Sequence, residues 1–190
     1  LIWDISYRGI RRANNLLFNI DKVTFKSEDT KNQIIGEAKF NRALNYFVLI
    51  RFYDHVAIVT EKDDMNAADL SNEGTDDAVW SLIEEDLKYA ESVLKTTYGA
   101  GDMGRATKGA AMAMLSKVYL TQAGWQWNKD GYWLKAAAKA DEIISNENSF
   151  GYGLETDFRK IFDVTNEHGK EYIFDVEFVT NINGNDFPAL

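Results

Sequence analysis

Three aromatic and two polar side chains lie close together in the stretch "WQWNKDGY", residues 125–132 of this 190-residue chain. They are Trp125, Trp127, Tyr132, Asn128 and Asp130. Aromatic rings can stack on the apolar C–H faces of sugars, while polar groups hydrogen-bond the ligand and fix its orientation. The same rings could instead fill the junction between two helices, so both interpretations stay open. These five residues form the candidate ligand-binding site.

The run Glu84, Glu85 and Asp86 is the first place to look for acid–base chemistry. A glycoside hydrolase needs two carboxyl groups that flank the bond to be broken. Neighbouring residues on a helix point in different directions, and the sequence places no second carboxylate opposite them. We therefore predict a solvated acidic face in which Asp86 pairs with a basic neighbour. We predict no catalytic residue, and hydrolase activity is the weaker alternative.

Two stretches resemble cofactor or metal motifs but lack the context that those motifs need. Residues 99–104, "GAGDMG", satisfy G-x-G-x-x-G, but a dinucleotide fingerprint follows a strand, and here a helix is expected before it. Residues 126–137 resemble a calcium loop, yet Gln126 and Ala137 stand where carboxylates are required. We therefore predict no metal ion and no cofactor.

The composition limits the possible partners. A formal net charge of −9 argues against binding to nucleic acid or to an anionic membrane surface, both of which favour clustered basic residues. No run approaches the roughly 20 apolar residues that cross a bilayer, so we predict no transmembrane segment. The chain has no cysteine, which excludes disulfides and thiolate metal sites. Because the chain starts at Leu1 rather than methionine, we expect it to be a trimmed piece of a longer protein.

Apolar residues recur at helical spacing over five segments, which predicts a mostly α chain. The expected helices span residues 2–18, 30–53, 76–94, 108–123 and 132–145. Thr107 is the expected N-cap of the fourth helix. Residues 56–60 are expected to be extended, and an acidic loop should follow them. A short helix is expected at 157–162, followed by a strand at 171–179, where apolar side chains alternate.

Antiparallel helices with alanines and aromatic residues at their crossings are typical of a TPR-like stack. We assign residues 1–150 to this stack. Residues 151–190 are expected to form a short helix and a strand that lead into a missing C-terminal region. The second helix carries two apolar stripes and should pack between layers. Asn14, on the apolar stripe of the first helix, should hydrogen-bond locally or to a neighbouring helix. The residues expected to face inward on the fifth helix are Trp133, Ala137, Ala140 and Ile144.

Residues 36–61, "GEAKFNRALNYFVLIRFYDHVAIVTE", resemble the signature of the SusD/RagB family, roughly GEA.x.RAx.YF.LxRxYG.VPLVTE. Four further segments agree with the family in order: "YRGIRRANNLL", "IEEDLKYAESVL", "GRATKGAAMAMLSKVYL" and "GKEYIFDVEF". The resemblance covers the chain from Trp3 to about Phe178. Two positions depart from the signature, because Asp54 replaces its usual glycine and Ala57 replaces its usual proline.

The resemblance implies a function at the surface of Gram-negative bacteria. Such proteins resemble outer-membrane lipoproteins that capture glycans, without cleaving them, and pass them to a SusC-like TonB-dependent transporter. The helical part is then mainly scaffold and transporter-facing surface, and the sugar contacts come from loops that vary between members. The lipid anchor is expected upstream of this chain. A TPR-like module that binds proteins and no sugar is the first alternative.

Overall fold

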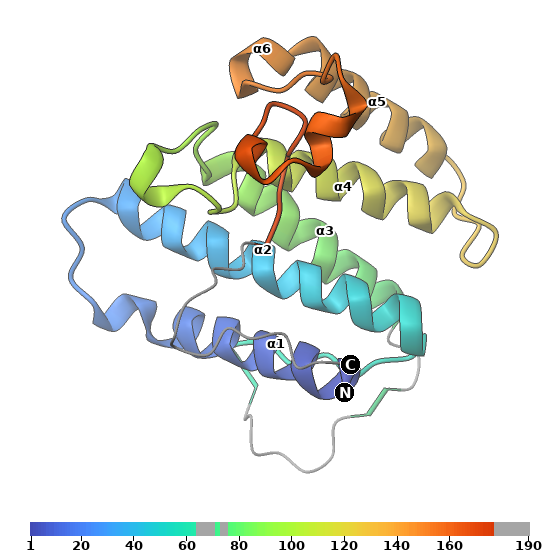
Figure 1. Cartoon of the computed structure of the whole chain (residues 1–190). Helices are drawn as coiled ribbons and strands as arrows, with labels where there is room; N and C mark the ends of the chain where they lie inside the picture. Colours follow the sequence, from blue (N-terminus) through green and yellow to red (C-terminus); the bar gives the residue numbers. More distant parts are fainter. Residues whose placement is uncertain (64–70, 73–75, 177–190) are drawn as a thin grey trace.

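The structure, a computed structural model, describes residues 1–63, 71–72 and 76–176. Five long helices run antiparallel to their neighbours in sequence, and a one-turn helix follows them (Figure 1). The helices are α1 (Ile2–Asn19), α2 (Glu28–Tyr53), α3 (Asp76–Val93), α4 (Lys108–Ala123), α5 (Tyr132–Ser145) and α6 (Glu147–Phe150). Short 3₁₀ turns are η1 (Ile20–Lys22), η2 (Ala100–Asp102), η3 (Phe158–Phe162) and η4 (Val164–Asn166). The predicted mostly α, TPR-like antiparallel stack is confirmed.

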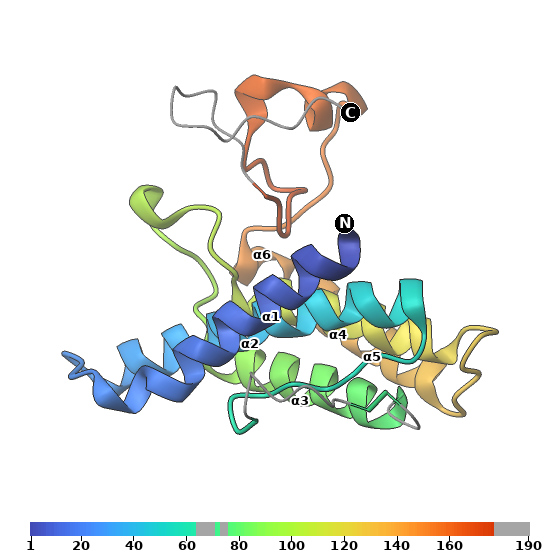
Figure 2. The ribbon, with the colours of Figure 1, turned by 90° about the horizontal axis from the view of Figure 1, so that it is seen from below.

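Helix α2 is the central element of the stack. It packs against α1 and α3, and α4 in turn packs against α3 and α5. Figure 2 shows α3 on one side of α2 and the described part of the tail, residues 151–176, on the other. The two apolar stripes of α2 are therefore both covered, as the sequence predicted. The largest buried apolar side chains of the core are Phe40, Tyr46, Leu49, Ile50, Trp80, Ile83, Leu87, Met112 and Leu115.

Local signals define where the helices begin and how closely they approach. The Thr107 hydroxyl accepts a hydrogen bond from the Ala110 N–H at 3.1 Å, so this predicted N-cap is confirmed. A β-carbon on Gly36 would lie 2.5 Å from Cγ2 of Val93, so only glycine allows α2 and α3 their present spacing. The Thr107 cap is encoded in a short stretch of sequence, which is why the start of α4 could be predicted.

The predicted inward face of α5 is wrong. Trp133 is 57% exposed, and Ile144 is also exposed, whereas Ala136 is buried against the core. Ser116 of α4 donates a hydrogen bond to the Ala136 carbonyl at 2.9 Å, and Lys139 pairs with Glu91 of α3. Because α5 has apolar residues on most sides, these polar contacts, rather than the apolar stripe, set its rotation.

The predicted C-terminal strand is also not found in the described part of the tail. Residues 171–176 form a turn and an irregular segment, in which the Phe174 ring packs against Phe40 at a centroid distance of 5.0 Å. Residues 177–179 of that prediction, and most of the acidic loop, lie outside the described residues. Residues 56–60, predicted to be extended, are in neither a helix nor a strand, and side chains rather than a neighbouring strand bind their backbone groups. The short helix expected at 157–162 is a 3₁₀ turn, and the division at residue 150 stays a prediction.

The chain leaves α2 through a residue that has a positive φ angle. Asp54 has φ 63° and ψ −94°, and its N–H donates to the Ile50 carbonyl at 3.1 Å. A β-carbon strains this conformation, whereas glycine adopts it readily. The turn therefore has the geometry that explains the glycine of the SusD/RagB signature, and Asp54 forms it at a cost.

Replacing Asp54 tests this strain. Asp54→Gly is expected to raise the free energy of unfolding by about 1 kcal/mol, because relief of the strain exceeds the entropic cost of glycine. Asp54→Ala keeps the β-carbon and should bring no gain. Urea unfolding midpoints of the three proteins measure the difference. A glycine variant less stable than the parent chain would show that Asp54 is not strained.

Two substitutions on opposite sides of α2 test its place in the stack. Phe47 is 2% exposed and packs on Trp80 of α3, so Phe47→Ala should cost about 3–5 kcal/mol of stability. Asn41 is exposed and its side chain donates to the Glu37 carbonyl of its own helix, so Asn41→Ala should cost under about 0.5 kcal/mol. Thermal or urea unfolding compares the two. Similar midpoints would contradict the assigned faces of α2.

Candidate functional site

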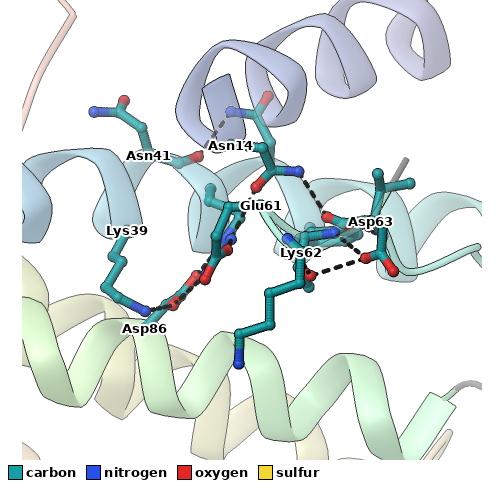
Figure 3. A network of polar contacts seen from close by, with 12 residues as sticks. Asn14, Lys39, Asn41, Glu61, Lys62, Asp63 and Asp86 are labelled. Carbon is teal, nitrogen blue, oxygen red and sulfur yellow. Dashed lines mark hydrogen bonds and ion pairs between the residues drawn. The ribbon is translucent and has the colours of Figure 1, made fainter. Parts of the chain in front are cut away.

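The most deeply buried ion pair of the described residues joins α2 to α3 (Figure 3). Nε and Nη2 of Arg42 donate to the two carboxylate oxygens of Asp86 at 2.6 and 2.9 Å. Nη1 of Arg42 donates to Asn14 of α1 at 2.8 Å and also to Glu61, and Lys39 donates to Asp86. Burial alone would lower the pKa of the Arg42 guanidinium, but its bonds to Asp86 and Glu61 raise it. The predicted pairing of Asp86 with a basic neighbour is confirmed.

The same region holds the segment that leaves α2. The Tyr46 hydroxyl donates to the Val59 carbonyl at 2.9 Å and accepts from the Val59 N–H at 2.7 Å. Asn14 also donates to the Val59 carbonyl, which confirms that this asparagine is satisfied by hydrogen bonds. The Tyr7 hydroxyl donates to the Ala57 carbonyl, and burial raises its pKa to about 12 despite that bond. These hydroxyl, amide and guanidinium groups bind other parts of the same chain. We therefore interpret the network as scaffold rather than as a ligand site.

A second buried carboxylate ties α3 to α4 and α5. Glu84 accepts hydrogen bonds from Gln122 at 2.9 Å, from Lys88 at 2.9 Å and from the Tyr132 hydroxyl at 3.1 Å. Burial would raise the pKa of Glu84, but the bonds from Gln122 and Lys88 lower it overall. The predicted solvated acidic face is therefore wrong, because only Glu85 of the three acidic residues is exposed.

Four of the five predicted ligand-binding residues lie on the loop between α4 and α5, and the fifth, Tyr132, is the first residue of α5. This loop turns back on itself, with the N–H groups of Trp127 and Asn128 both donating to the Gly124 carbonyl. Asn128 has a positive φ of 46°, which asparagine tolerates better than most residues, so it helps to form the turn. The side chains of Asn128 and Asp130 are exposed.

The three aromatic rings of the predicted site have different environments. Trp127 is half-buried and meets Trp80 edge to face, at a centroid distance of 5.0 Å. Tyr132 is also half-buried, with Lys135 lying 3.7 Å over its ring. Trp125, in contrast, is 93% exposed. Trp127 and Tyr132 therefore fill the junction between helices, and Trp125 alone presents most of its surface to solvent.

An open pocket of about 320 Å³ lies beside Trp125. Its lining combines this loop with the last turns of α2 and α4: Arg51, Thr121, Gly124, Trp125, Gln126 and Trp127. Arg51 lies 4.9 Å over the ring of Phe47, which contacts Trp80, which in turn contacts Trp127. This series of ring contacts connects opposite sides of the pocket through the core.

Sequence reasoning missed four of these lining residues: Gly124 and the three with polar side chains, Arg51, Thr121 and Gln126. Arg51 is far from the loop in sequence. One signal could have found it, because antiparallel order brings the C-terminal ends of α2 and α4 to the same end of the stack. The Thr121 hydroxyl, the Gln126 amide and the Arg51 guanidinium can hydrogen-bond a polar ligand that covers the Trp125 ring.

The glycine-rich loop has a structural explanation. Arg105 donates from Nε and Nη2 to both carboxylate oxygens of Glu37, at 3.0 and 2.8 Å, which docks the loop on α2. The loop follows helix α3 rather than a strand, unlike a dinucleotide fingerprint. Among the described residues, no three acidic or histidine side chains gather as metal ligands. No helix in the described ranges is long and apolar enough to cross a membrane.

The chain is similar to known proteins over nearly its whole length. Residues 1–120 match the SusD-like family model described as "Starch-binding associating with outer membrane". The chain is 29% identical over 182 residues to the SusD-like protein P25 of Formosa agariphila, covering 96% of this chain and 32% of that protein. It therefore spans about a third of this curated relative.

Solved structures share the fold as well. A SusD-like protein from Bacteroides fragilis matches with a TM-score of 0.79 and 29% identity, over 94% of this chain and 33% of that one. A structure named as a laminarin-binding SusD-like protein matches with a TM-score of 0.77 and 30% identity, over 91% of this chain and 36% of that one. With the family model covering more than half of its residues, this chain belongs to the SusD-like family.

Proposed function

We propose that this chain is part of a protein that binds glycans at the bacterial outer membrane without cleaving them. The observation that carries the proposal is Trp125, an indole almost fully exposed beside a pocket lined by polar side chains. Membership of a family described as starch-binding supports it, as does the similarity to a laminarin-binding protein. The sugar stacks on the Trp125 ring, and Arg51, Thr121 and Gln126 hydrogen-bond its hydroxyls.

The other predicted residues have supporting roles in this proposal. Trp127 lines the pocket and packs on Trp80, and Tyr132, which bonds Glu84, holds the start of α5 next to the loop. Asn128 and Asp130 are exposed on the same loop and can reach the outer parts of a ligand. Ligand binding should cost little side-chain conformational entropy at such a site, because the tryptophan side chain has few rotamers to lose.

The states of Glu84 and Asp86, the two acidic side chains buried among the described residues, support binding without catalysis. Glu84 is engaged with Gln122, Lys88 and Tyr132, and Asp86 is engaged with Arg42 and Lys39. A catalytic acid or base must be able to reach a substrate proton, and these buried, fully bonded carboxylates do not. In the proposal, the bound glycan leaves the protein unchanged and passes to a SusC-like TonB-dependent transporter.

Single tryptophan substitutions test the proposed site. Trp125→Ala should raise the glycan dissociation constant about fivefold to tenfold, since a central stacking ring contributes on the order of 1 kcal/mol or more. Its melting temperature should stay nearly unchanged because the side chain is exposed. Trp127→Ala should instead lower stability by about 2 kcal/mol, since its ring packs on Trp80.

Calorimetric titration with laminarin and with other glycans, together with melting curves, separates the two effects. Trp133→Ala is the control, since this tryptophan is exposed on α5 and lies outside the pocket. It should change neither the affinity nor the melting temperature appreciably. Glycan binding that survives Trp125→Ala unchanged would remove Trp125 from the site.

A further inference from the structure

The end of the stack that carries the pocket also presents a row of exposed aromatic rings. Figures 1 and 2 place the start of α1, the end of α2 and the α4–α5 loop toward the same end. We call the side chains that lie across this end the aromatic strip: Trp3, Tyr53, Phe52, Arg51 and Trp125. Phe52, in the middle of the strip, is 65% exposed.

Helix geometry explains why the strip runs across α2. Successive residues of an α-helix are about 100° apart around its axis. Phe47 points to Trp80 of α3, and Arg51 lies about 40° from Phe47, over its ring. Phe52 lies about 140° from Phe47, and Tyr53 about 120° in the opposite sense. Phe52 is therefore on the side turned away from α3, between Arg51 and Tyr53.

Ring contacts continue from Phe52 to α1. The Phe52 and Tyr53 rings are 6.5 Å apart between centroids, and Tyr53 meets the Trp3 ring edge to face at 5.0 Å. The Tyr53 hydroxyl accepts a hydrogen bond from the Trp3 N–H at 3.3 Å. On the other side, Arg51 lines the pocket together with Trp125. Arg51, which directly precedes Phe52 in the sequence, is therefore the residue that joins the strip to the candidate site.

We propose that Phe52 and Tyr53 form a second sugar subsite and that the protein binds a glycan chain of several sugars. This inference rests on the proposed function. A row one side chain wide suits an extended chain better than a globular protein, whose interface covers about 800 Å² per partner. Arg51 and Gln126, which line the pocket beside Trp125, supply hydrogen-bonding groups to the same ligand.

Two connected subsites make affinity depend on glycan length. Once one end of a chain is bound at Trp125, the other end meets Phe52 at a high effective concentration. A glycan long enough to reach both rings should therefore bind about tenfold tighter than a disaccharide of the same linkage. Phe52→Ala should remove this gain and leave disaccharide binding unchanged, whereas Phe52→Trp should retain it.

The test is a glycan array of the full chain in which each glycan, laminarin and xyloglucan fragments included, is present as a short and a long oligosaccharide. Isothermal titration then gives dissociation constants for the bound pair. Phe18→Ala is the matched control, because Phe18 is 62% exposed but lies at the other end of α1. It should alter neither constant. Melting curves establish that each variant is folded.

Each outcome decides a separate point. Tighter binding of the long glycan that Phe52→Ala abolishes and Phe18→Ala preserves supports the second subsite. Equal binding of short and long glycans, or a length dependence unaffected by Phe52→Ala, overturns the subsite while the proposed function stands. Equal weakening of both lengths by Phe52→Ala also overturns it, because Phe52 would then belong to the first site. Absence of binding to every glycan overturns both proposals.

Discussion

The buried ion pair between Arg42 and Asp86 is the interaction on which the rest of the structure depends. Removing one member of such a pair leaves an uncompensated charge in the core and costs about 3–5 kcal/mol. Arg42 also requires Asn14 and Glu61, so α1, α3 and the segment after α2 must all be in place around α2 before its guanidinium is satisfied. A single side chain thereby links the packing of four segments. Arg42 and Glu61 belong to the SusD/RagB signature, and Asn14 and Asp86 lie in two of the further segments that agree with the family.

The helices could be predicted because their signals are local. Apolar periodicity and the Thr107 cap placed α4 and α5 at the observed bounds. What failed depends on contacts that are distant in sequence. The rotation of α5 follows from the partners of Ser116 and Lys139, and Glu84 is buried because Gln122 and Tyr132 arrive from other helices. Alternating apolar residues likewise predicted a strand near Phe174, but this ring packs on α2, and the described residues offer no strand to pair with it.

The candidate site was predictable to the same limited extent. Composition alone drew attention to the α4–α5 loop, but it could not distinguish Trp125, which is exposed, from Trp127, which is packed against Trp80. That distinction requires knowing that α3 passes beneath the loop. Arg51 was recognised only as part of the family signature, and its place in the pocket follows from the antiparallel order of α2 and α4.

The scaffold and the site therefore meet at few points. The α4–α5 loop is attached to the helices through Trp127, which packs on Trp80, and through Lys129, which bonds Gln122 and pairs with Asp77, while Tyr132 at the start of α5 bonds Glu84. Substitutions at Trp125 or Asp130 can change the surface offered to a ligand without disturbing the Arg42 network. Arg51 differs, because it is a signature residue that lies over the buried Phe47 ring and also lines the pocket. If the proposed function holds, this arrangement would keep the Arg51 guanidinium in one position at the end of α2 while substitutions in the loop change the surface next to it.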